Sequence, residues 1–576
     1  MISIAYLLLY MAAGVQMIRF LLPRKSPLVR GWLGAALGML LEMQLPALFA
    51  WLFGFTIQAH IAAVAALAAI LKACRYLRDN RSPAAMTAED KRQAAVMAAV
   101  CLPLTALSVY LQYTHMLMPA SDGSYWCGQS TYGDLCMHLA FITSMKDMSF
   151  PPTYNLLAGT ALSYPYLTDS LSTTFYMLGM PLNLALVVPG TLLMALTYAG
   201  YMLLAQQILG GRHKAVAVAA LLFFFNGGLG FLYDFDLAFT DHFARVKEIF
   251  TGYYKTPANQ PDFNLRFSNV IADLMIPQRA LMGGWAMGIP ALYLLISSSR
   301  EKSMRQTVLL ALEGGALRFQ FNWVNNSGGR GFKDGYFWFW VKNAGLPFIL
   351  VVCACLNAGR RGHLDLVLGM TAIYAVAETI LFQPNEYDNN KLFYIWFMLA
   401  MILAADYGSI LMQRLAGLRG RGLLCGLFIW ASVFSGALSI GREAVSGYQL
   451  FSANAVKAGA WIEENTAHDD VFLTGQQHIN PVCSLAGRQI ICGSDLYVFF
   501  HGLDYGQQSA DCRRFFEDPA HNGDVLETYD VHYIYVSDYE RAEFDVDTET
   551  LEATYPIVYE NQDVRIYDAK GQVDAP

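Results

Sequence analysis

Charged residues are scarce for a chain of this length. Asp, Glu, Lys and Arg make up 15% of the 576 residues, whereas about 25% is usual in soluble proteins. Hydrophobic residues make up 55%, and a single soluble core stops growing at about 250–300 residues. This composition excludes one large soluble domain. The net charge of −7 also argues against nucleic acid as a partner, because binding to a phosphate backbone needs a basic surface.

The chain also lacks the common signatures of nucleotide, metal and hydrolase sites. It contains no P-loop, no GxSxG motif, no HExxH motif and no Rossmann fingerprint. Its ten cysteines include no CxxC pair and no zinc-type spacing. The sequence therefore gives no indication of a nucleoside triphosphate or a structural zinc ion.

Apolar blocks of about 20 residues, the length that crosses a bilayer as a helix, recur along the chain. The first block, at 2–22, is too long for the apolar region of a signal peptide and no small-residue cleavage site follows it, so we expect it to be a span. The twelve predicted spans lie near 2–22, 33–53, 57–74, 94–114, 183–208, 214–233, 281–299, 305–321, 344–357, 364–383, 391–411 and 421–440.

Lys and Arg residues gather in alternate loops of this predicted bundle, which orients it because basic loops stay in the cytoplasm. With an outside N-terminus, all six basic clusters fall on the cytoplasmic side. The tail from 441 and the loops 115–182 and 234–280 then face outward. We therefore expect a multi-pass protein of the cell membrane, embedded in the lipid bilayer, with an extracytoplasmic tail.

The tail differs in character from the apolar part. Charges become more frequent, and short strand-like segments follow a predicted helix at 453–465. The predicted strands are 471–473, 489–492, 531–536, 557–559 and 564–567. The predicted fold is an α-helical polytopic membrane bundle of about 12 helices over 1–440, followed by a small α/β domain over 441–576.

A carboxylate and an imidazole lie four residues apart in the long loop 115–182. If a helix begins there, Asp134 and His138 share one of its faces. This pair suits general-base catalysis or metal binding, so Asp134 is a candidate base or a ligand for a divalent metal such as Mg²⁺ or Mn²⁺. In the structural alternative, Asp134 is a helix N-cap and His138 packs at the interface.

Tyrosines in the same loop offer flat amphipathic surfaces. Tyr164 and Tyr166 follow the rigid Phe-Pro-Pro segment at 150–152 and precede Asp169. Such surfaces stack against a sugar or a lipid head group. An aromatic belt at the membrane interface has the same composition and is the alternative interpretation.

Two cations stand at the predicted outer boundary of the bundle. Arg279 follows Pro277 and Gln278 just before a span, and Lys391 ends the polar run at 388–390 between two spans. Charges at this depth are candidate functional residues, and both side chains bind phosphate. Snorkelling of Arg279 and a solvated turn before Lys391 are the structural alternatives.

Seven short motifs follow one another in a fixed order from about residue 115 to the tail. They are Gly133-Asp134…His138, Phe150-Pro151-Pro152, Tyr164-Pro165-Tyr166-Leu167…Asp169, Pro277-Gln278-Arg279, Phe339-Trp340…Lys342-Asn343-Ala344-Gly345, Asp388-Asn389-Asn390-Lys391 and Ala486-Gly487-Arg488. This order resembles the bacterial and archaeal polytopic glycosyltransferases of the GT-C superfamily. Two features depart from that family, since three additional spans precede the acidic loop and the segment 311–335 lacks a hydrophobic span.

The resemblance implies an inverting glycosyltransferase that takes a sugar from a polyprenyl-phosphate-linked donor at the outer membrane face. It implies that Asp134, with His138, is catalytic and that Arg279 and Lys391 hold the donor phosphate. We expect further substrate contacts from Tyr164, Tyr166, Asp169, Gln278, Asp388, Asn389 and Asn390. The acceptor would be a glycan, a lipid or a protein.

Two other functions fit the same apolar pattern. A transporter or flippase of a lipid-linked saccharide would need polar groups inside several spans, where Glu42, Glu313 and Glu378 are the main candidates. A non-catalytic assembly protein of the cell envelope would not need Asp134. In the tail, His478 and Arg488 are the residues of interest.

Overall fold

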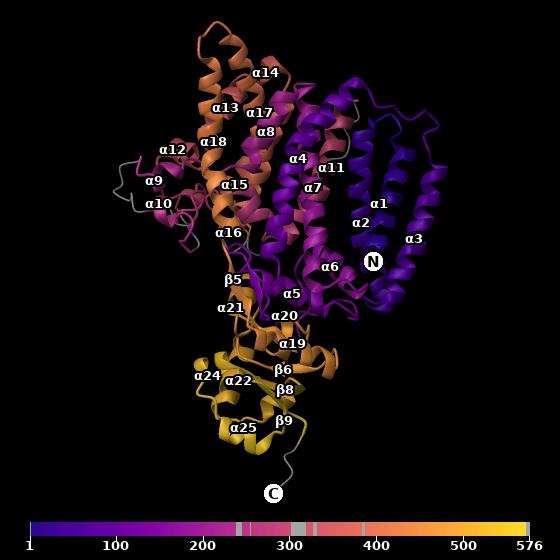
Figure 1. Cartoon of the computed structure of the whole chain (residues 1–576), viewed down its shortest axis with the longest axis vertical. Helices are drawn as coiled ribbons and strands as arrows, with labels where there is room; N and C mark the ends of the chain where they lie inside the picture. The colour runs from indigo at the N-terminus through magenta and orange to yellow at the C-terminus, as the bar shows by residue number, and fades with distance from the viewer. Residues whose placement is uncertain are drawn as a thin grey trace.

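The computed structural model describes residues 2–237, 245–253, 255–300, 318–326, 331–382 and 386–571. Long helices stand side by side in a bundle, and a smaller unit of strands and helices is attached at one end (Figure 1). The C-terminus lies at the far end of this smaller unit.

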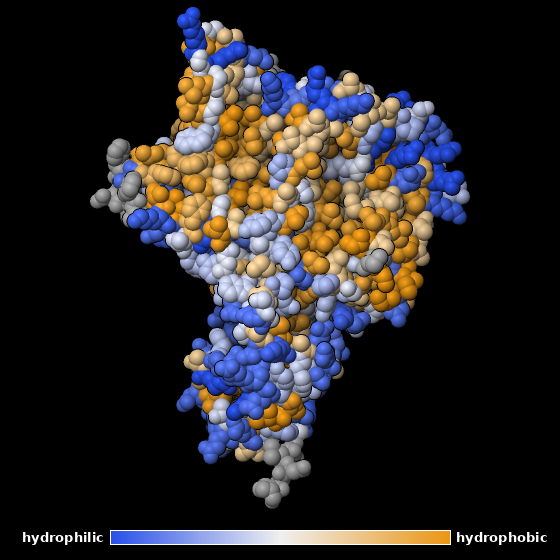
Figure 2. Space-filling view, viewed as in Figure 1, coloured by the Kyte–Doolittle hydropathy of each residue, from blue (hydrophilic) through white to orange (hydrophobic). Residues whose placement is uncertain are grey.

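Eight of the described helices are long and apolar enough to cross a membrane. They are α1 (Ile2–Leu21), α2 (Pro27–Phe53), α3 (Ile57–Tyr76), α4 (Ala88–His115), α7 (Leu182–Leu209), α11 (Arg279–Arg300), α17 (Lys391–Arg414) and α18 (Arg421–Ala444). Their outward surface forms an apolar band between a polar rim and the polar tail (Figure 2). The chain is therefore a multi-pass membrane protein, as the apolar blocks predict.

Three other predicted spans coincide with shorter helices: α8 (His213–Phe224), α13 (Pro347–Leu356) and α15 (Leu364–Thr379). α8 stops early because Gly228 takes a φ of +60° and the Asn226 side chain turns back, donating to Ser268 O at 2.8 Å and accepting from Val270 N at 2.8 Å. α13 and the preceding α12 (Tyr336–Ala344) meet at 118° and together would make one bent span. Local breakers thus shorten helices whose composition predicts full spans.

The predicted span at 305–321 falls mainly outside the described residues. Its described end is not helical, because β3 (Arg318–Phe319) pairs antiparallel with β4 (Ile380–Leu381). The remaining short helices of the bundle part are α9 (Phe231–Asp234), α10 (Arg245–Glu248), η1 (Pro261–Phe263), η2 (Val270–Met275), η3 (Val324–Asn326), α14 (Ala358–Arg361) and α16 (Glu386–Asn389). Eight such helices, or nine if the bent pair α12 and α13 is one span, lie among the described residues, and the total of twelve spans stays a prediction.

Two short helices of the loop 115–182 lie at the end of the bundle that carries the tail (Figure 1). They are α5 (Leu135–Ser144) and α6 (Leu167–Met177), and every residue of α5 is buried. A helix that is apolar on all sides must be covered on all sides, and α5 packs against α6 and against α20 (Pro481–Ser484) of the tail.

The tail builds one five-stranded sheet in the order β7-β6-β8-β10-β9. The strands are β6 (Val471–Leu473), β7 (Gln489–Ile490), β8 (Val531–Val536), β9 (Ile557–Glu560) and β10 (Arg565–Asp568). β7, β6 and β8 run parallel, and β10 is antiparallel to β8 and β9. The helices of this part are α19 (Ala453–Asn465), α20, α21 (Asp495–Phe500), α22 (Gly506–Glu517), α23 (Asp524–Thr528), α24 (Asp538–Glu543) and α25 (Thr548–Thr554).

The loop 115–182 and the tail share one hydrophobic core. Phe141 and Tyr154 of the loop are buried with Phe472, Val482 and Ile534 of the tail. A second, small sheet also joins the two parts, since β2 (Tyr125–Cys127) pairs with β1 (Met118–Pro119) and with β5 (Tyr448–Phe451). The tail therefore fixes the position of the loop that carries the candidate site.

Candidate active site

A cavity of about 1330 Å³ lies where the loops of the bundle meet the tail. Its wall comes from the loop 115–182, the segment 253–281, the start of α17 and the helix α21 of the tail. The charged and titratable groups of the wall are Asp134, Asp262, Asp273, Asp388, Lys255, Arg266, Lys391, Tyr164, Tyr253, Tyr497 and His501. The cavity thus combines acids, cations and aromatic rings from segments far apart in the sequence.

Asp134 occupies the N-cap position of α5, but its side chain makes no capping hydrogen bond. It lines the cavity instead, where its Oδ2 accepts a hydrogen bond from Gln278 Nε2 at 2.9 Å. Burial raises the pKa of this carboxyl. The Asp388 carboxylate also raises it, whereas His138 and Lys391 lower it. The N-cap interpretation is therefore correct for the backbone position of Asp134 and wrong for its side chain.

His138, Asp169 and Arg279 form a buried ionic network with one another. His138 Nδ1 donates to Asp169 Oδ2 at 2.9 Å, and Arg279 Nε donates to Asp169 Oδ1 at 2.7 Å. The three side chains are at most 1% exposed, and none lines the cavity. Burial acts to raise the pKa of Asp169, but His138 and Arg279 hold that pKa below its ordinary value.

This network places three predicted site residues outside the cavity wall. A buried guanidinium needs an anion beside it, and Asp169 is that anion for Arg279. His138 contacts Asp169 and not Asp134. The predicted roles of these three residues in catalysis and substrate binding stay predictions. The network joins α5, α6 and α11, and the residue before Arg279 is the Gln278 that donates to Asp134. These side chains therefore position the acid.

Lys391 and its neighbours lie where the sequence predicts them. Lys391 Nζ and Asp388 Oδ1 are 2.7 Å apart, both side chains are partly exposed, and both line the cavity. Asn390 also lines the cavity. Asn389 does not, because its Oδ1 accepts from Phe382 N at 2.7 Å and holds the turn before α17. The start of α17 thus presents a cation, an acid and an amide to the cavity.

Only one of the two predicted tyrosines lines the cavity. Tyr164 lines it and packs edge-on against His138, with the ring centroids 5.9 Å apart. Tyr164 and Tyr166 both line an adjoining apolar groove of about 560 Å³. The groove is lined by Leu40, Met43, Gln44, Ala47, Leu48, Trp51, Tyr164, Pro165, Tyr166, Leu167, Thr168, Ala280, Gly283, Gly284 and Met287. Cavity and groove share Tyr164, Pro165 and Ala280.

Asp273 is a cavity residue that the sequence motifs do not indicate. It stands on the π-helix η2, and its Oδ2 accepts from Asn269 N at 2.7 Å. Burial raises the pKa of Asp273 to about 7. A π-helical turn inside a longer segment is a frequent feature of functional sites, but no local sequence pattern predicted one here.

The tail holds the backbone on either side of Asp134. His478 Nε2 donates to Tyr132 O at 3.2 Å, and Tyr497 Oη donates to Gly133 O at 2.9 Å. Ser484 Oγ donates to Cys136 O at 2.9 Å. His478 thus contacts the loop that carries Asp134.

Arg488 has a structural role inside the tail. Its guanidinium donates to backbone oxygens of Glu463 and Thr466, each at 3.0 Å. The preceding Gly487 takes a φ of +69°, and a Cβ there would lie 2.6 Å from the carbonyl carbon of Thr143 in α5. The motif Ala486-Gly487-Arg488 therefore marks the contact between the tail and α5.

Within the part of the chain that the structure describes, no three His, Cys, Asp or Glu side chains come together in a group that could hold a metal. Mg²⁺ is often held by only one or two carboxylates together with substrate phosphates and water. Asp134 as a ligand of Mg²⁺ or Mn²⁺ therefore stays a prediction.

No protein-family model and no curated protein matches the chain. Among solved structures, it is similar to the oligosaccharyltransferase of Archaeoglobus fulgidus tethered with an acceptor peptide containing the NVT sequon. The TM-score is 0.39 at 11% identity, over 83% of this chain and 74% of that one. For the apo form the TM-score is 0.40 at 12% identity, over 80% and 72%. A likeness of this size establishes neither the family nor the activity of the chain.

Proposed function

We propose that this protein is a GT-C-type membrane glycosyltransferase that moves a sugar from a polyprenyl-phosphate-linked donor to an acceptor at the membrane face where the tail lies. The observation that carries this proposal is one polar cavity, with Asp134 and Lys391 in its wall, that adjoins an apolar groove of the bundle. A lipid-linked sugar is divided in the same way, since an apolar chain leads to a phosphate and then to a polar sugar.

The start of α17 has the features that would hold the donor phosphate. Asn390 and Lys391, the N-cap and first residues of α17, both line the cavity. The N-terminus of a helix favours anions, because its first N–H groups and its dipole are directed at them. Lys391 is paired with Asp388, so the phosphate would replace or join that carboxylate as a partner of the ammonium group.

The groove would hold the first isoprenoid units of the donor. Its walls are α2, α6 and α11, and its lining is almost entirely apolar. α2 is one of the four helices that precede the acidic loop, so this N-terminal part of the chain supplies one wall of the groove.

Asp134 would act as the general base. Its carboxylate takes the proton of an acceptor hydroxyl while the hydroxyl oxygen attacks the anomeric carbon of the donor sugar. The bond from that carbon to the phosphate oxygen breaks, and polyprenyl phosphate leaves against Lys391. One displacement inverts the anomeric centre. Burial raises the pKa of Asp134, which makes it a stronger base for this transfer.

The orientation of the chain supports a site outside the cytoplasm. The basic α3–α4 connection stands at the opposite end of the bundle from the tail (Figure 1), and basic loops are retained in the cytoplasm. We accordingly propose a membrane-embedded catalytic part over 1–440 and an extracytoplasmic α/β domain over 441–576. The acceptor, a glycan, a lipid or a protein, would approach along the tail residues Leu496, Phe500 and His501 of the cavity wall.

The competing transporter function has weaker support. Glu42 and Glu378 are buried inside the bundle at 1% and 2% exposure, yet neither lines the cavity or the groove. Glu313 lies outside the described residues. In a transporter of a lipid-linked saccharide, such charges would line the path of the substrate through the spans.

The test is sugar transfer in membranes supplied with a labelled polyprenyl-phosphate sugar pool. The wild type is compared with Asp134→Asn and with Asp262→Asn, a control acid that lines the same cavity but is 62% exposed and paired with Lys255. Asp134→Asn should lower transfer by about 10²–10⁴-fold, the usual contribution of a general base, while Asp262→Asn retains it. Equal transfer by Asp134→Asn and wild type would refute the role of Asp134. No transfer by the wild type would favour the transporter or assembly function.

A further inference from the structure

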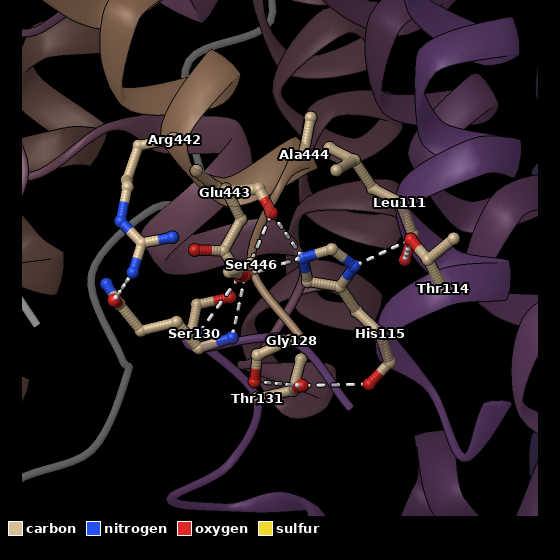
Figure 3. A network of polar contacts seen from close by, with 12 residues as sticks. Leu111, Thr114, His115, Gly128, Ser130, Thr131, Arg442, Glu443, Ala444 and Ser446 are labelled. Atoms are coloured by element: carbon tan, nitrogen blue, oxygen red, sulfur yellow. Dashed lines mark hydrogen bonds and ion pairs between the residues drawn. The ribbon is translucent and has the colours of Figure 1, made fainter. Parts of the chain in front are cut away.

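A buried ion pair joins the ends of two spans beside the acidic loop. His115 is the last residue of α4, Glu443 stands in the last turn of α18, and His115 Nε2 lies 3.0 Å from Glu443 Oε1 (Figure 3). Both side chains are 0% exposed. Two apolar side chains of similar volume often stabilise a fold at least as well as such a pair, so the pair calls for a role beyond stability.

The His115 ring is held at both of its nitrogens. Nε2 lies 3.0 Å from Glu443 Oε1 and 3.0 Å from the Glu443 backbone oxygen, and both of these atoms are acceptors. Nδ1 lies 2.8 Å from Thr114 Oγ1. These contacts fix the imidazole between the ends of α4 and α18.

The same junction holds three consecutive residues of the acidic loop. Glu443 Oε1 accepts from Ser130 N at 2.9 Å, and Ser446 Oγ accepts from Gln129 N at 3.0 Å. Thr131 Oγ1 donates to His115 O at 2.8 Å. Gln129 and Ser130 line the cavity, and Asp134 follows four residues after Ser130.

Two neighbours of the ion pair strengthen this hold. Arg442 Nη2 donates to Gln129 Oε1 at 2.7 Å and to Gly252 O, also at 2.7 Å. A Cβ at Gly128 would lie 1.6 Å from the His115 ring, so only glycine lets the loop pass over the imidazole. The loop therefore passes directly over the His115–Glu443 pair.

We infer that His115 and Glu443 are positioning residues that fix the loop 128–134, so that the Asp134 carboxylate faces the cavity. The positioning of the loop does not depend on the proposed function. Only the catalytic role of Asp134 rests on the proposed function. Glu443 and Ser446 stand where the last span passes into the tail. The His115–Glu443 pair therefore also fixes the position of this loop relative to the tail. The tail itself donates hydrogen bonds to Tyr132 O and Gly133 O on the other side of the loop.

The first readout is hydrogen–deuterium exchange of peptides covering 128–134 in lipid nanodiscs, which does not depend on transfer. The variants are Glu443→Gln and the double apolar variant His115→Leu with Glu443→Leu, which removes both charges together. The control is Asp406→Asn, which breaks the ion pair between the buried Asp406 and the partly exposed Arg212, away from the loop. We expect the exchange rate at Ser130 N to rise about tenfold in both variants at the ion pair, because a buried hydrogen bond is lost. In Asp406→Asn the exchange rate should stay unchanged.

The second readout separates positioning from stability. The double apolar variant should unfold at about the wild-type temperature, and its transfer should fall about 100-fold in kcat, as for a misplaced catalytic group, with KM for the donor unchanged. Unchanged exchange over 128–134 in both variants, or an equal rise in Asp406→Asn, overturns the inference. Raised exchange in a protein whose wild type transfers no sugar supports the positioning role and refutes the proposed function.

Discussion

Asp134 and Asp169 belong to the same loop and lie in opposite electrostatic surroundings. Burial raises the pKa of Asp134, which lines the cavity and accepts one hydrogen bond from Gln278. Asp169 is also buried, but His138 and Arg279 keep its pKa low. The first carboxylate is therefore suited to take up a proton, and the second is a permanent counter-ion that holds α5, α6 and α11 together.

Asp169→Asn should destabilise the protein, whereas Asp134→Asn should not. Removal of the Asp169 charge leaves Arg279 buried without an anion, which lowers the free energy of unfolding by about 3–5 kcal/mol. Asp134→Asn removes a carboxylate whose ionised form is disfavoured by burial. Thermal unfolding in detergent compares the two. If Asp169→Asn unfolds like the wild type while its donor KM rises, Arg279 would be a substrate ligand after all.

The sequence predicts candidate residues better than it predicts their partners. Asp134, Lys391, Asp388 and Asn390 reach the cavity because local motifs place them at the ends of helices. The bond between Arg279 and Asp169 spans 110 positions, and no local pattern encodes such a pairing. Asp273, Tyr497 and His501 reach the same cavity only through tertiary packing.

At the scale of elements, the positions where helices break shape the fold as much as the helices themselves. Hydrophobic length correctly predicts helices at most of the spans, but Asn226 and Gly228 end α8, and Gly345 with a φ of +80° separates α12 from α13. Composition over about 20 residues averages over single breakers, so sequence reasoning does not locate the positions where these helices end.

Gly487→Ala should loosen the contact between the tail and α5. The added Cβ would lie 2.6 Å from a backbone atom of Thr143, and φ at this position is +69°, so the variant should lose about 1–3 kcal/mol of stability through overpacking. Sugar transfer should fall as α5 shifts. Gly523→Ala is the matched control, because its Cβ meets nothing within 4 Å. Equal unfolding temperatures for the two variants would contradict this account of the contact.

At the scale of the whole molecule, the tail and the N-terminal helices complete the site from opposite sides. The tail shares its core with the acidic loop and places Tyr497 and His501 in the cavity wall. α2 supplies a wall of the groove. The sequence predicts the membrane part and the strands of the tail, because each depends on local periodicity. It does not predict that these parts meet around one cavity.

Gly284→Leu should block the groove. Gly284 lines the groove and has open space around its Cβ position, so a leucine there would exclude part of the donor chain. Exclusion of about two CH₂ groups raises KM for the donor about tenfold. Gly288→Leu, one turn further along α11 and outside the groove, is the control. Titration of the donor in the transfer assay measures both, and equal KM values would place the lipid chain elsewhere.

The most direct test of the central claim is a structure of the protein in nanodiscs with an unreactive phosphonate analogue of a polyprenyl-phosphate sugar. The account predicts the phosphonate at Lys391 and the first residues of α17, the sugar beside Asp134, and the isoprenoid chain between α2, α6 and α11. An analogue bound through the spans away from this cavity, or not bound at all, would contradict it.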